Sequence, residues 1–404
     1  MILTFLSLTA LVGTLPSYKS ELLARTNGSS TYNMPAYSSM NNTSPSINDE
    51  GDVTFKILSG GFDQVGDHSE QSGLWLKTNK EIDGRVVYYA PKEKLVSDPK
   101  MLAHQEVLFS LFNEVSNDGL FIYENTNQKS HNVFAAKEIQ ALSYAQETGS
   151  DDSFAFRSTD SENSRSFFEW RSDKLWPVVD EEHGYAYLFG PSVNQHSQWL
   201  FKARLGERFN YAEEAPDQIV LLIPQFTAFG EKSYLKTVIA QDADSDALSP
   251  YKSFDNSPLL SNAGYAVFTA TLKDKTRVIV AVKEGKHFIV AKENENSISQ
   301  IEMFSPKIND NGLVVFRAKD KNGLRGIFLA NPFSVHPEVK KLIAEGDSIL
   351  ADQGMFAILK RDQFPGFGGN VDINNNNEIV FSAVIATEDQ KFIFGSVVYK
   401  LHPL

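Results

Sequence analysis

The sequence predicts an all-β fold, and the arrangement that fits it best is a β-propeller with seven blades of three to four antiparallel strands. Three observations carry this prediction: a turn-and-strand motif recurs along the chain, strand-like segments precede and follow each copy, and no long amphipathic helical pattern is present. Phe (29) and Tyr (14) are abundant, and aromatic side chains favour strands.

The motif is clearest in two segments that lie far apart. Residues 44–57 read SPSINDEGDVTFKI and residues 305–318 read SPKINDNGLVVFRA. Asn and Asp side chains bond to their own backbone in turns, and Gly allows a positive φ. The residues after the turn alternate with period two, which is typical of a strand. Each copy therefore predicts a tight turn followed by a buried strand.

The aromatic residue that closes the motif recurs seven times, about 54 residues apart on average. Copies at 191–203, 257–270 and 372–383 keep most of the pattern, and copies at 116–124 and 149–158 are weak. The seven aromatic positions are Phe55, Tyr123, Phe156, Phe201, Phe268, Phe316 and Phe381. Because two copies are weak, six or eight blades stay open as alternatives.

The repeated unit needs neighbours to be stable. A sheet of three or four short strands cannot bury both faces by itself, whereas seven such sheets arranged radially can, and closing the ring leaves few free edges. An open β-solenoid is the alternative architecture. It favours shorter and more uniform repeats than this chain has.

The amino terminus predicts export. Residues 2–13 form an apolar segment with the length of a signal-peptide core, which is too short to span a bilayer. We expect residues 1–18 to be a signal peptide and residues 19–404 to form a single propeller domain of seven repeats. The mature protein is then secreted, periplasmic or on the cell surface, without a membrane span. A buried first strand is the alternative interpretation of the apolar segment.

The composition excludes several kinds of function. The net charge is −13, and an acidic surface repels nucleic acid. The chain has no cysteine, which excludes disulfides, thiolate metal sites and cysteine nucleophiles. No His-Glu-x-x-His or Gly-x-Ser-x-Gly motif is present either. The sequence predicts no catalytic residue and no organic cofactor.

One acidic loop is a candidate calcium site. Asp242, Asp244 and Asp246 place three carboxylates at alternate positions, and calcium takes six to eight oxygen ligands. Residues 372–378 (DINNNNE) show part of the same spacing, but they coincide with a repeat turn. A solvated acidic loop and an Asn-rich turn are the alternative interpretations.

The motif, Asn-x-x-Gly-x-x-x-Phe followed by a small residue, resembles the tandem repeat of bacterial exported proteins with the NxxGxxxAF pattern. The residues that carry the resemblance best are Asn48, Gly51, Phe55, Asn309, Gly312 and Phe316. Two copies lose both the Asn and the Gly. In addition, copy four has Ser197 and copy seven has Asn377 where Gly is expected. Over about residues 20–400, the resemblance implies a propeller-like surface or extracellular protein. It implies no activity.

The recurring residues all have turn or packing roles, so the sequence favours a non-enzymatic binding or scaffold protein over an enzyme. The ligand, an unknown protein or glycan, is expected on a loop face. The longest segments between strands are 58–72, 202–217, 241–256 and 348–370. Two alternatives stay open: an extracellular hydrolase or lyase acting on polysaccharide or peptide, and a structural surface or matrix component.

Overall fold

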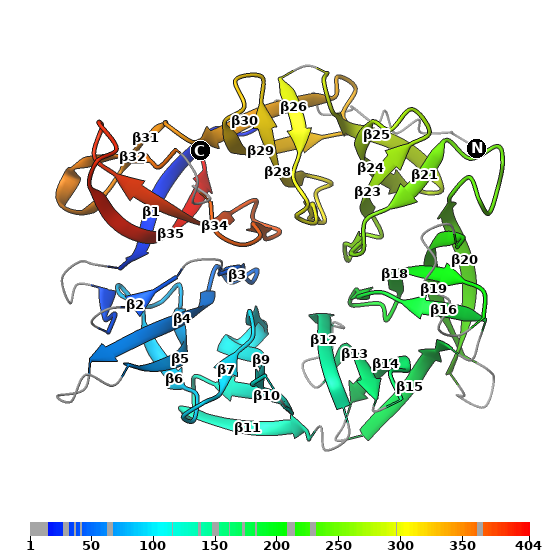
Figure 1. Ribbon diagram of the computed structural model, residues 1–404, viewed down its shortest axis with the longest axis horizontal. Coiled ribbons are helices and arrows are strands. Elements are labelled where there is room, and N and C mark those ends of the chain that lie inside the picture. Colours follow the sequence, from blue (N-terminus) through cyan, green and yellow to red (C-terminus); the bar gives the residue numbers. More distant parts are fainter. Residues whose placement is uncertain are drawn as a thin grey trace, which may run out of the picture.

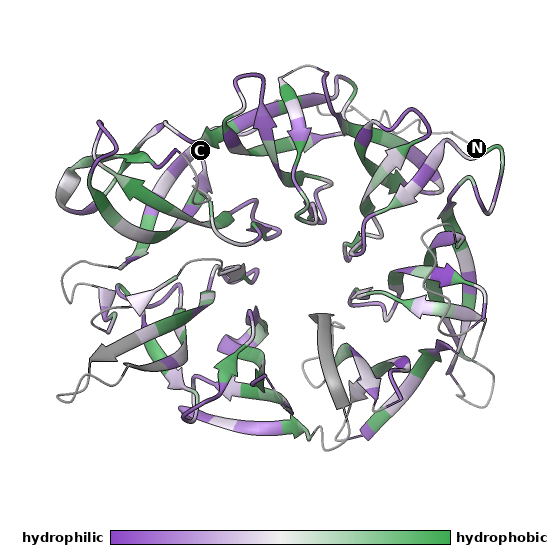
Figure 2. Cartoon of the chain, viewed as in Figure 1, coloured by the Kyte–Doolittle hydropathy of each residue, from purple (hydrophilic) through white to green (hydrophobic). Residues whose placement is uncertain are grey.

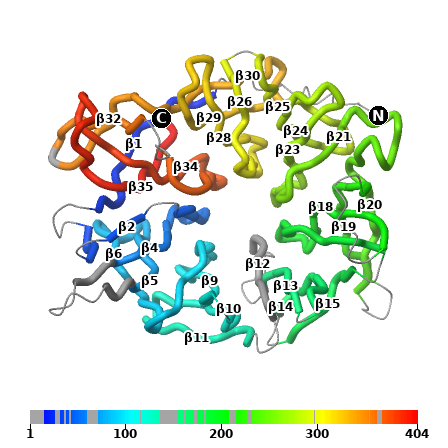
Figure 3. Tube along the Cα trace, in the orientation of Figure 1, coloured from blue at the N-terminus to red at the C-terminus, as the bar shows by residue number. Residues whose placement is uncertain are grey.

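The computed structural model confirms the all-β prediction and the seven blades. Seven antiparallel sheets form a ring around a central axis (Figure 1), and the chain passes around this ring once (Figure 3). The structure describes residues 15–26, 32–35, 38–40, 43–62, 68–114, 116–135, 139–147, 153–160, 162–171, 174–181, 184–207, 215–226, 232–295, 297–361 and 367–404.

The blades follow the chain in order. Blade 1 contains β2 (Ser38–Ser39), β3 (Ser46–Ile47), β4 (Val53–Phe62), β5 (His68–Lys77) and β6 (Arg85–Tyr89). Blade 2 contains β7 (Leu95–Val96), β8 (Lys100–Met101), the 3-10 helix η2 (Ala103–Gln105), β9 (Glu106–Phe112), β10 (Asn117–Glu124) and β11 (Lys129–Phe134). Blade 3 contains β12 (Ile139–Glu147), β13 (Ser153–Asp160), β14 (Arg165–Arg171) and β15 (Lys174–Asp180). Blade 4 contains β16 (Tyr185–Leu188), β17 (Ser192–Val193), β18 (Trp199–Leu205), β19 (Asp217–Phe226) and β20 (Lys232–Gln241).

The last three blades have the same plan, and the final one also takes up the first strand of the chain. Blade 5 contains β21 (Tyr251–Phe254), β22 (Leu259–Leu260), β23 (Ala266–Leu272), β24 (Arg277–Lys283) and β25 (Lys286–Lys292). Blade 6 contains β26 (Ile298–Ile301), β27 (Lys307–Ile308), β28 (Val314–Asp320), β29 (Arg325–Asn331) and β30 (Glu338–Ala344). Blade 7 contains β31 (Ser348–Leu350), η4 (Asp352–Gly354), β32 (Phe356–Leu359), β33 (Asp372–Ile373), β34 (Ile379–Ala386), β35 (Ile393–Pro403) and β1 (Tyr18–Arg25).

The inner strand of most blades is divided into two short pieces. In blade 6, β26 and β27 both pair with β28, and β29 and β30 complete the sheet. The motif proline stands just before the second piece. Proline has no backbone N–H and interrupts strand pairing, which accounts for the break. The prolines at this position are Pro45, Pro99, Pro191, Pro258 and Pro306.

The ring is closed by the two ends of the described chain. Strand β1 pairs with β35 from Tyr18 opposite Pro403 to Arg25 opposite Val397. It is therefore the outermost strand of blade 7, although the sequence repeat places it ahead of the first copy. The repeated sequence unit and the structural blade are offset by one strand.

The expected boundary between signal peptide and domain falls close to this closing strand. Residues 1–14 lie outside the described residues. Leu15 is buried in the core of blade 7, and the Leu404 amide donates a hydrogen bond to the Ser17 carbonyl at 2.8 Å. Residues 15–18, assigned to the signal peptide from the sequence, are thus part of the fold. Cleavage that leaves these contacts intact must occur before Leu15, and export itself remains a prediction.

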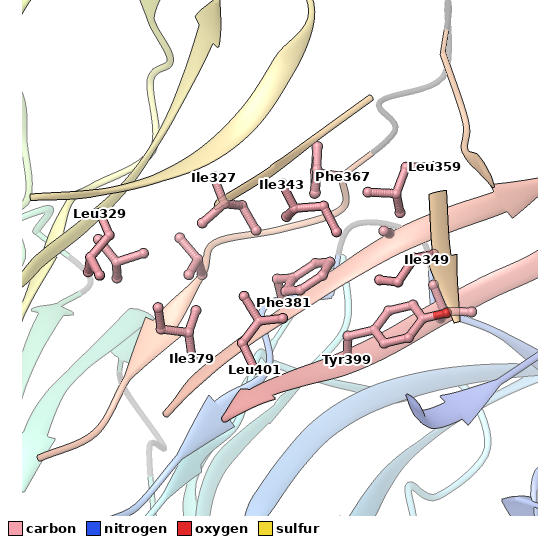
Figure 4. Close-up of a cluster of buried hydrophobic side chains, with 14 of the residues drawn as sticks. Ile327, Leu329, Ile343, Ile349, Leu359, Phe367, Ile379, Phe381, Tyr399 and Leu401 are labelled. Carbon is pink, nitrogen blue, oxygen red and sulfur yellow. The ribbon is translucent and has the colours of Figure 1, made fainter. Parts of the chain in front are cut away.

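The aromatic residue of the motif organises each blade core. Phe316 lies opposite Phe328 on the next strand, and their ring centroids are 5.7 Å apart. Phe381 and Tyr399 repeat this pair in blade 7, where Figure 4 shows them among buried aliphatic side chains. Figure 2 shows hydrophobic residues along the strands and hydrophilic ones at turns near the axis.

The structure corrects the position of the second copy. Tyr123 lies in β10, one strand too late, and the equivalent aromatic is Phe109 in β9. Phe109 lies opposite Phe121, with ring centroids 5.7 Å apart. In this copy Leu102 replaces the motif Asn and Gln105 replaces Gly, with φ 64°. The copy was missed because neither turn residue of the motif remains.

No helix among the described residues combines the length and the apolar character that crossing a membrane requires.

Candidate ligand site in the central channel

A central channel is lined by residues of the second inner strand and of the turn that follows it in blades 1, 2, 4, 5, 6 and 7. Around the axis, β3 contacts β8 and β33, and β27 contacts β22 and β33. Two cavities of about 310 and 440 Å³ lie in this channel. Four residues line both of them, namely Lys100, Leu259, Lys307 and Asp372, and they form the waist of the channel.

Where the motif Asn is present, it joins its turn to the next blade, as Asn48, Asn194, Asn309 and Asn374 do. Asn309 Oδ1 accepts hydrogen bonds from the amides of Asn311 and Leu313, which fixes its own turn. Its Nδ2 donates to the Asn374 carbonyl at 2.9 Å. Asn374 Nδ2 donates in turn to the Asn48 carbonyl at 2.9 Å. Asn is required here because its side chain both accepts and donates.

The channel mouth on the turn side is acidic and amide-rich. Asn375 Nδ2 donates to Asp49 Oδ2 and to Asp310 Oδ2, each at 2.8 Å. The amide of Asn375 donates to Asp49 Oδ1, and the amide of Ala263 donates to Asp310 Oδ1. These two carboxylates therefore hold neighbouring turns together. Glu50, which is exposed, adds a third carboxylate to this mouth.

A second set of contacts between blades uses the residue that follows the motif proline. Ser46 Oγ accepts from the Met101 amide at 3.1 Å, and Ser192 Oγ accepts from the Leu260 amide at 3.0 Å. Asp372 Oδ2 accepts from the Ile47 amide at 3.3 Å. A side-chain acceptor at this position thus accepts a hydrogen bond from a backbone amide of the next blade.

Lys100 and Lys307 occupy the same position. They cannot accept a hydrogen bond from an amide of the next blade, since an ammonium group only donates. Lys100 Nζ lies 3.5 Å from Asp372 Oδ2. Lys307 Nζ has no hydrogen bond or ion pair with the residues that the structure describes. The waist therefore holds two ammonium groups and one carboxylate, and contacts between blades do not account for the two lysines.

Burial shifts the pKa values at the waist. Burial lowers the pKa of Lys307; Asp372 opposes this shift and Lys100 adds to it. Burial alone would raise the pKa of Asp372, but Lys100, Lys307 and hydrogen bonds from Ile47 and Ser46 hold it below its usual value. Asp372 is thus kept ionised, and Lys307 is less readily protonated than a lysine in water.

The opposite mouth of the channel has a different chemistry. Buried prolines and aliphatic side chains contribute to the cavity of about 440 Å³, together with Ser and Asn groups. Its apolar members are Pro45, Pro99, Pro191, Pro258, Leu259 and Val371. Apart from the waist, Asp98 is the one charged residue among the described side chains that line this cavity. Asp98 is paired with Lys56 at 2.9 Å, so its charge is balanced.

The structure places the three predicted calcium ligands in a folded turn. Asp242 accepts hydrogen bonds from the amides of Asp217, Asp244 and Ser245. Asp244 pairs with Lys252 at 2.9 Å, and Asp246 accepts from the Leu248 amide. Among the described residues, no three His, Cys, Asp or Glu side chains gather as a metal site requires. The calcium site stays a prediction without added support.

The four long segments expected to bind ligand contribute little to the channel. Of their described residues, Asn370 at the end of 348–370 lines the cavity of about 440 Å³. The expectation of a ligand on a loop face is not tested by this geometry. The channel is a separate candidate, and it brings together charged residues from blades 2, 6 and 7.

The sequence contains a signal for the channel residues that the motif analysis did not use. In the motif Ser-Pro-x-Ile, the Ile side chain is buried in the blade. Because successive side chains of a strand point to opposite faces, residue x points away from the blade core. The residues at x that the structure describes are Ser46, Lys100, Ser192, Leu259, Lys307 and Asp372. All six line the channel. Position x varies between copies, so it is not part of the repeated pattern.

Comparison with known proteins shows the fold alone. No protein-family model matches the chain, and no curated protein sequence matches it. An oligogalacturonate lyase from Vibrio parahaemolyticus is similar in structure, with a TM-score of 0.55 and 10% identity over 96% of this chain and 97% of that one. The β-propeller domain of the Trilobed protease from Pyrococcus furiosus has a TM-score of 0.52 and 11% identity, covering 89% and 95%. These likenesses define the chain as a member of the structural class of β-propellers.

Proposed function

We propose that this protein is an exported, non-enzymatic binding propeller that holds a small anionic ligand in its central channel. The observation that carries the proposal is the waist, where Lys100 and Lys307 face a single carboxylate, Asp372. A carboxylate or a similar anion bridging the two ammonium groups would balance the charge. It would also supply the hydrogen bonds that Lys307 lacks among the described residues.

Physical cost supports this reading of the waist. Lys100 and Lys307 are half-buried. Removing part of the water around an ammonium group is unfavourable, and the protein lowers that cost by pairing the group or shifting its pKa. The four other described residues at the same motif position are Ser, Leu and Asp, and three of these four accept hydrogen bonds from the next blade. Two lysines there give up those bonds, which is expected where a ligand supplies the compensating interaction.

Export and membership of the NxxGxxxAF proteins remain part of the proposal. The apolar segment at residues 2–13 supports export. The motif residues Asn309, Gly312 and Phe316 support the resemblance, since each has the turn or core role that the pattern implies. Secretion into medium or periplasm, with loss of the apolar segment, is measured by mass spectrometry of the mature amino terminus.

Titration calorimetry with small carboxylates and inorganic phosphate tests the binding function. Lys307→Met and Lys100→Met should each weaken binding about 10- to 100-fold, the size expected for one charge-assisted hydrogen bond. Lys321→Met is the matched control, because Lys321 is exposed on the surface of blade 6 and should leave affinity unchanged. Equal affinities for all four proteins would refute the proposal.

A second candidate is a lyase or hydrolase, as in the structurally similar oligogalacturonate lyase and protease propeller. The lowered pKa of Lys307 favours it, because it eases deprotonation, and a deprotonated amine can accept a proton from carbon next to a carboxylate held by Lys100. Lys307→Arg separates the two candidates. An arginine stays charged, so it keeps anion binding and removes any turnover of uronate oligosaccharides.

A further inference from the structure

The two mouths of the channel are chemically opposite, and this polarity bears on how a ligand reaches the waist. On the turn side, Asp49, Glu50 and Asp310 line the cavity of about 310 Å³ with Gln and Asn side chains. The lysines that line this cavity are Lys100 and Lys307, both at the waist. An anion approaching from this side meets a carboxylate field before it meets a cation.

The described residues of the proline side form no such barrier. Asp98 is the one carboxylate among them outside the waist, and Lys56 pairs with it. The volume of about 440 Å³ lies within the range of small-molecule pockets, about 300–1,000 Å³. Its walls combine proline rings, Leu259 and Val371 with Ser hydroxyl groups. An apolar ligand body is stabilised there by removal from water.

We infer that the ligand is a monocarboxylate with an apolar body that enters from the proline-lined mouth with its carboxylate leading. The carboxylate lies between Lys100 and Lys307, and the body fills the proline-lined cavity. This inference rests on the proposed anion binding and adds the ligand class and the direction of approach. It explains why the two mouths of the channel differ in chemistry. Binding of an anion alone would not require that difference.

An affinity series separates the inference from the function on which it rests. Acetate, butyrate, hexanoate and phenylpropionate are titrated into the wild-type protein and into Lys307→Met. Affinity should rise with each buried methylene by up to about fourfold, and Lys307→Met should weaken every member by a similar factor. A flat series that still depends on Lys307 overturns the inference and leaves anion binding standing. Binding that is independent of Lys307 overturns both.

Galacturonate in the same series provides a contrast in body chemistry. It carries a carboxylate on a hydroxylated ring of a size comparable to phenylpropionate. The inference predicts that phenylpropionate binds at least tenfold more tightly. Tighter binding of galacturonate would overturn the apolar body and favour a sugar-acid ligand at the same lysines.

The direction of approach is tested by blocking one mouth at a time. Ser257 and Glu50 are both exposed and line opposite mouths. By stopped-flow binding, Ser257→Trp should slow association at least tenfold and Glu50→Trp less than twofold. Glu50→Trp also removes a negative charge, so Glu50→Gln measures the effect of that charge on the association rate separately. Thermal melting checks that all variants fold. The reverse order of rates would overturn the direction of approach.

Discussion

Blades 6 and 2 share one strand plan, yet they preserve the motif to different degrees. Blade 6 has Asn309 and Gly312 in its turn, and Asn309 both closes that turn and bonds to blade 7. Blade 2 has Leu102 and Gln105 at these positions, and its turn becomes η2, with φ of 56° at His104 and 64° at Gln105. The aromatic pair survives in both blades.

The difference separates two tasks that the motif performs. The aromatic residue and the alternating strand are enough to form a blade. The polar turn determines how firmly that blade is joined to the next one. The chain of Asn contacts runs from Asn309 through Asn374 to Asn48, whose Nδ2 donates to the Leu102 carbonyl. It ends there, because a leucine side chain cannot donate.

The largest expected effect tests the shared part of the two blades. Phe109→Ala and Phe316→Ala should each lower the free energy of unfolding by about 3–5 kcal/mol, since both rings are fully buried. Urea denaturation measures this. Phe392→Ala is the control, because Phe392 is 70% exposed, and it should change stability by less than about 0.5 kcal/mol. A loss at Phe316 without one at Phe109 would contradict the corrected repeat.

The next effect tests the link between blades. Asn374→Asp keeps the oxygen that closes the turn and removes the donor to the Asn48 carbonyl. The Asn48 carbonyl keeps its hydrogen bond from the Gly51 amide, but the variant also loses the hydrogen bond from Asn374 to Glu378 and places two carboxylates side by side. Together these losses should cost about 1–3 kcal/mol, measured by urea denaturation at neutral pH. Asn322→Asp lies in an exposed turn and should cost less than about 0.5 kcal/mol. Equal losses for both variants would mean that the Asn contacts do not join the blades.

A smaller effect concerns the glycine position of the turn. Ser197 in blade 4 has φ 54°, and Gly312 in blade 6 has φ 75°. Left-handed conformation costs a non-glycine residue about 1–2 kcal/mol, and glycine loses part of that gain through its greater chain entropy. Ser197→Gly should therefore stabilise the protein by about 0.5 kcal/mol.

The reverse substitution sharpens this comparison. Gly312→Ala should destabilise the protein, because the alanine would have to adopt the left-handed conformation and the added Cβ would lie 2.8 Å from Phe333 Cδ2. Thermal melting of both variants measures the two effects. A lower melting temperature for Ser197→Gly would show that the turn does not need the left-handed geometry.

The smallest effect lies at the ring closure between blades 7 and 1. Burial alone would raise the pKa of Glu21, but Lys77 and His402 outweigh it and hold that pKa below its usual value. A carboxylate with a lowered pKa stabilises the fold above its unfolded pKa and loses this contribution as pH falls through the folded value. Glu21→Gln should cost a few tenths of a kcal/mol near neutrality and nothing in acid. A difference that grew as pH fell would contradict this sign.

The propeller could be predicted from the sequence because the strongest copies of the motif contain every residue that the turn and the strand require. Asn309, Gly312 and Phe316 appear together with a period-two strand. The same logic failed in blade 2, where Leu102 and Gln105 remove both polar signals. A turn that contacts from neighbouring blades keep in place can have a leucine where the motif has Asn. The spacing of residues in the sequence does not show these stabilising contacts.

The candidate site was harder to predict for a different reason. Lys100, Lys307 and Asp372 lie 207 and 65 residues apart in sequence, and only ring closure brings them to one waist. Their shared motif position was readable from the buried apolar residue that follows each of them, namely Met101, Ile308 and Ile373. Which charges then meet across the axis depends on the order and number of blades, which no single copy contains.

The pairing of β1 with β35 has a consequence for the order of the chain. Leu404 and Ser17 are hydrogen-bonded neighbours, so a short linker between them and a new opening at the exposed turn around Asp274 would preserve all seven sheets. Such a circular permutant should fold to the same ring. In the natural order, blade 7 draws on the first and last strands described, so the nascent chain cannot close the ring until β35 has left the ribosome.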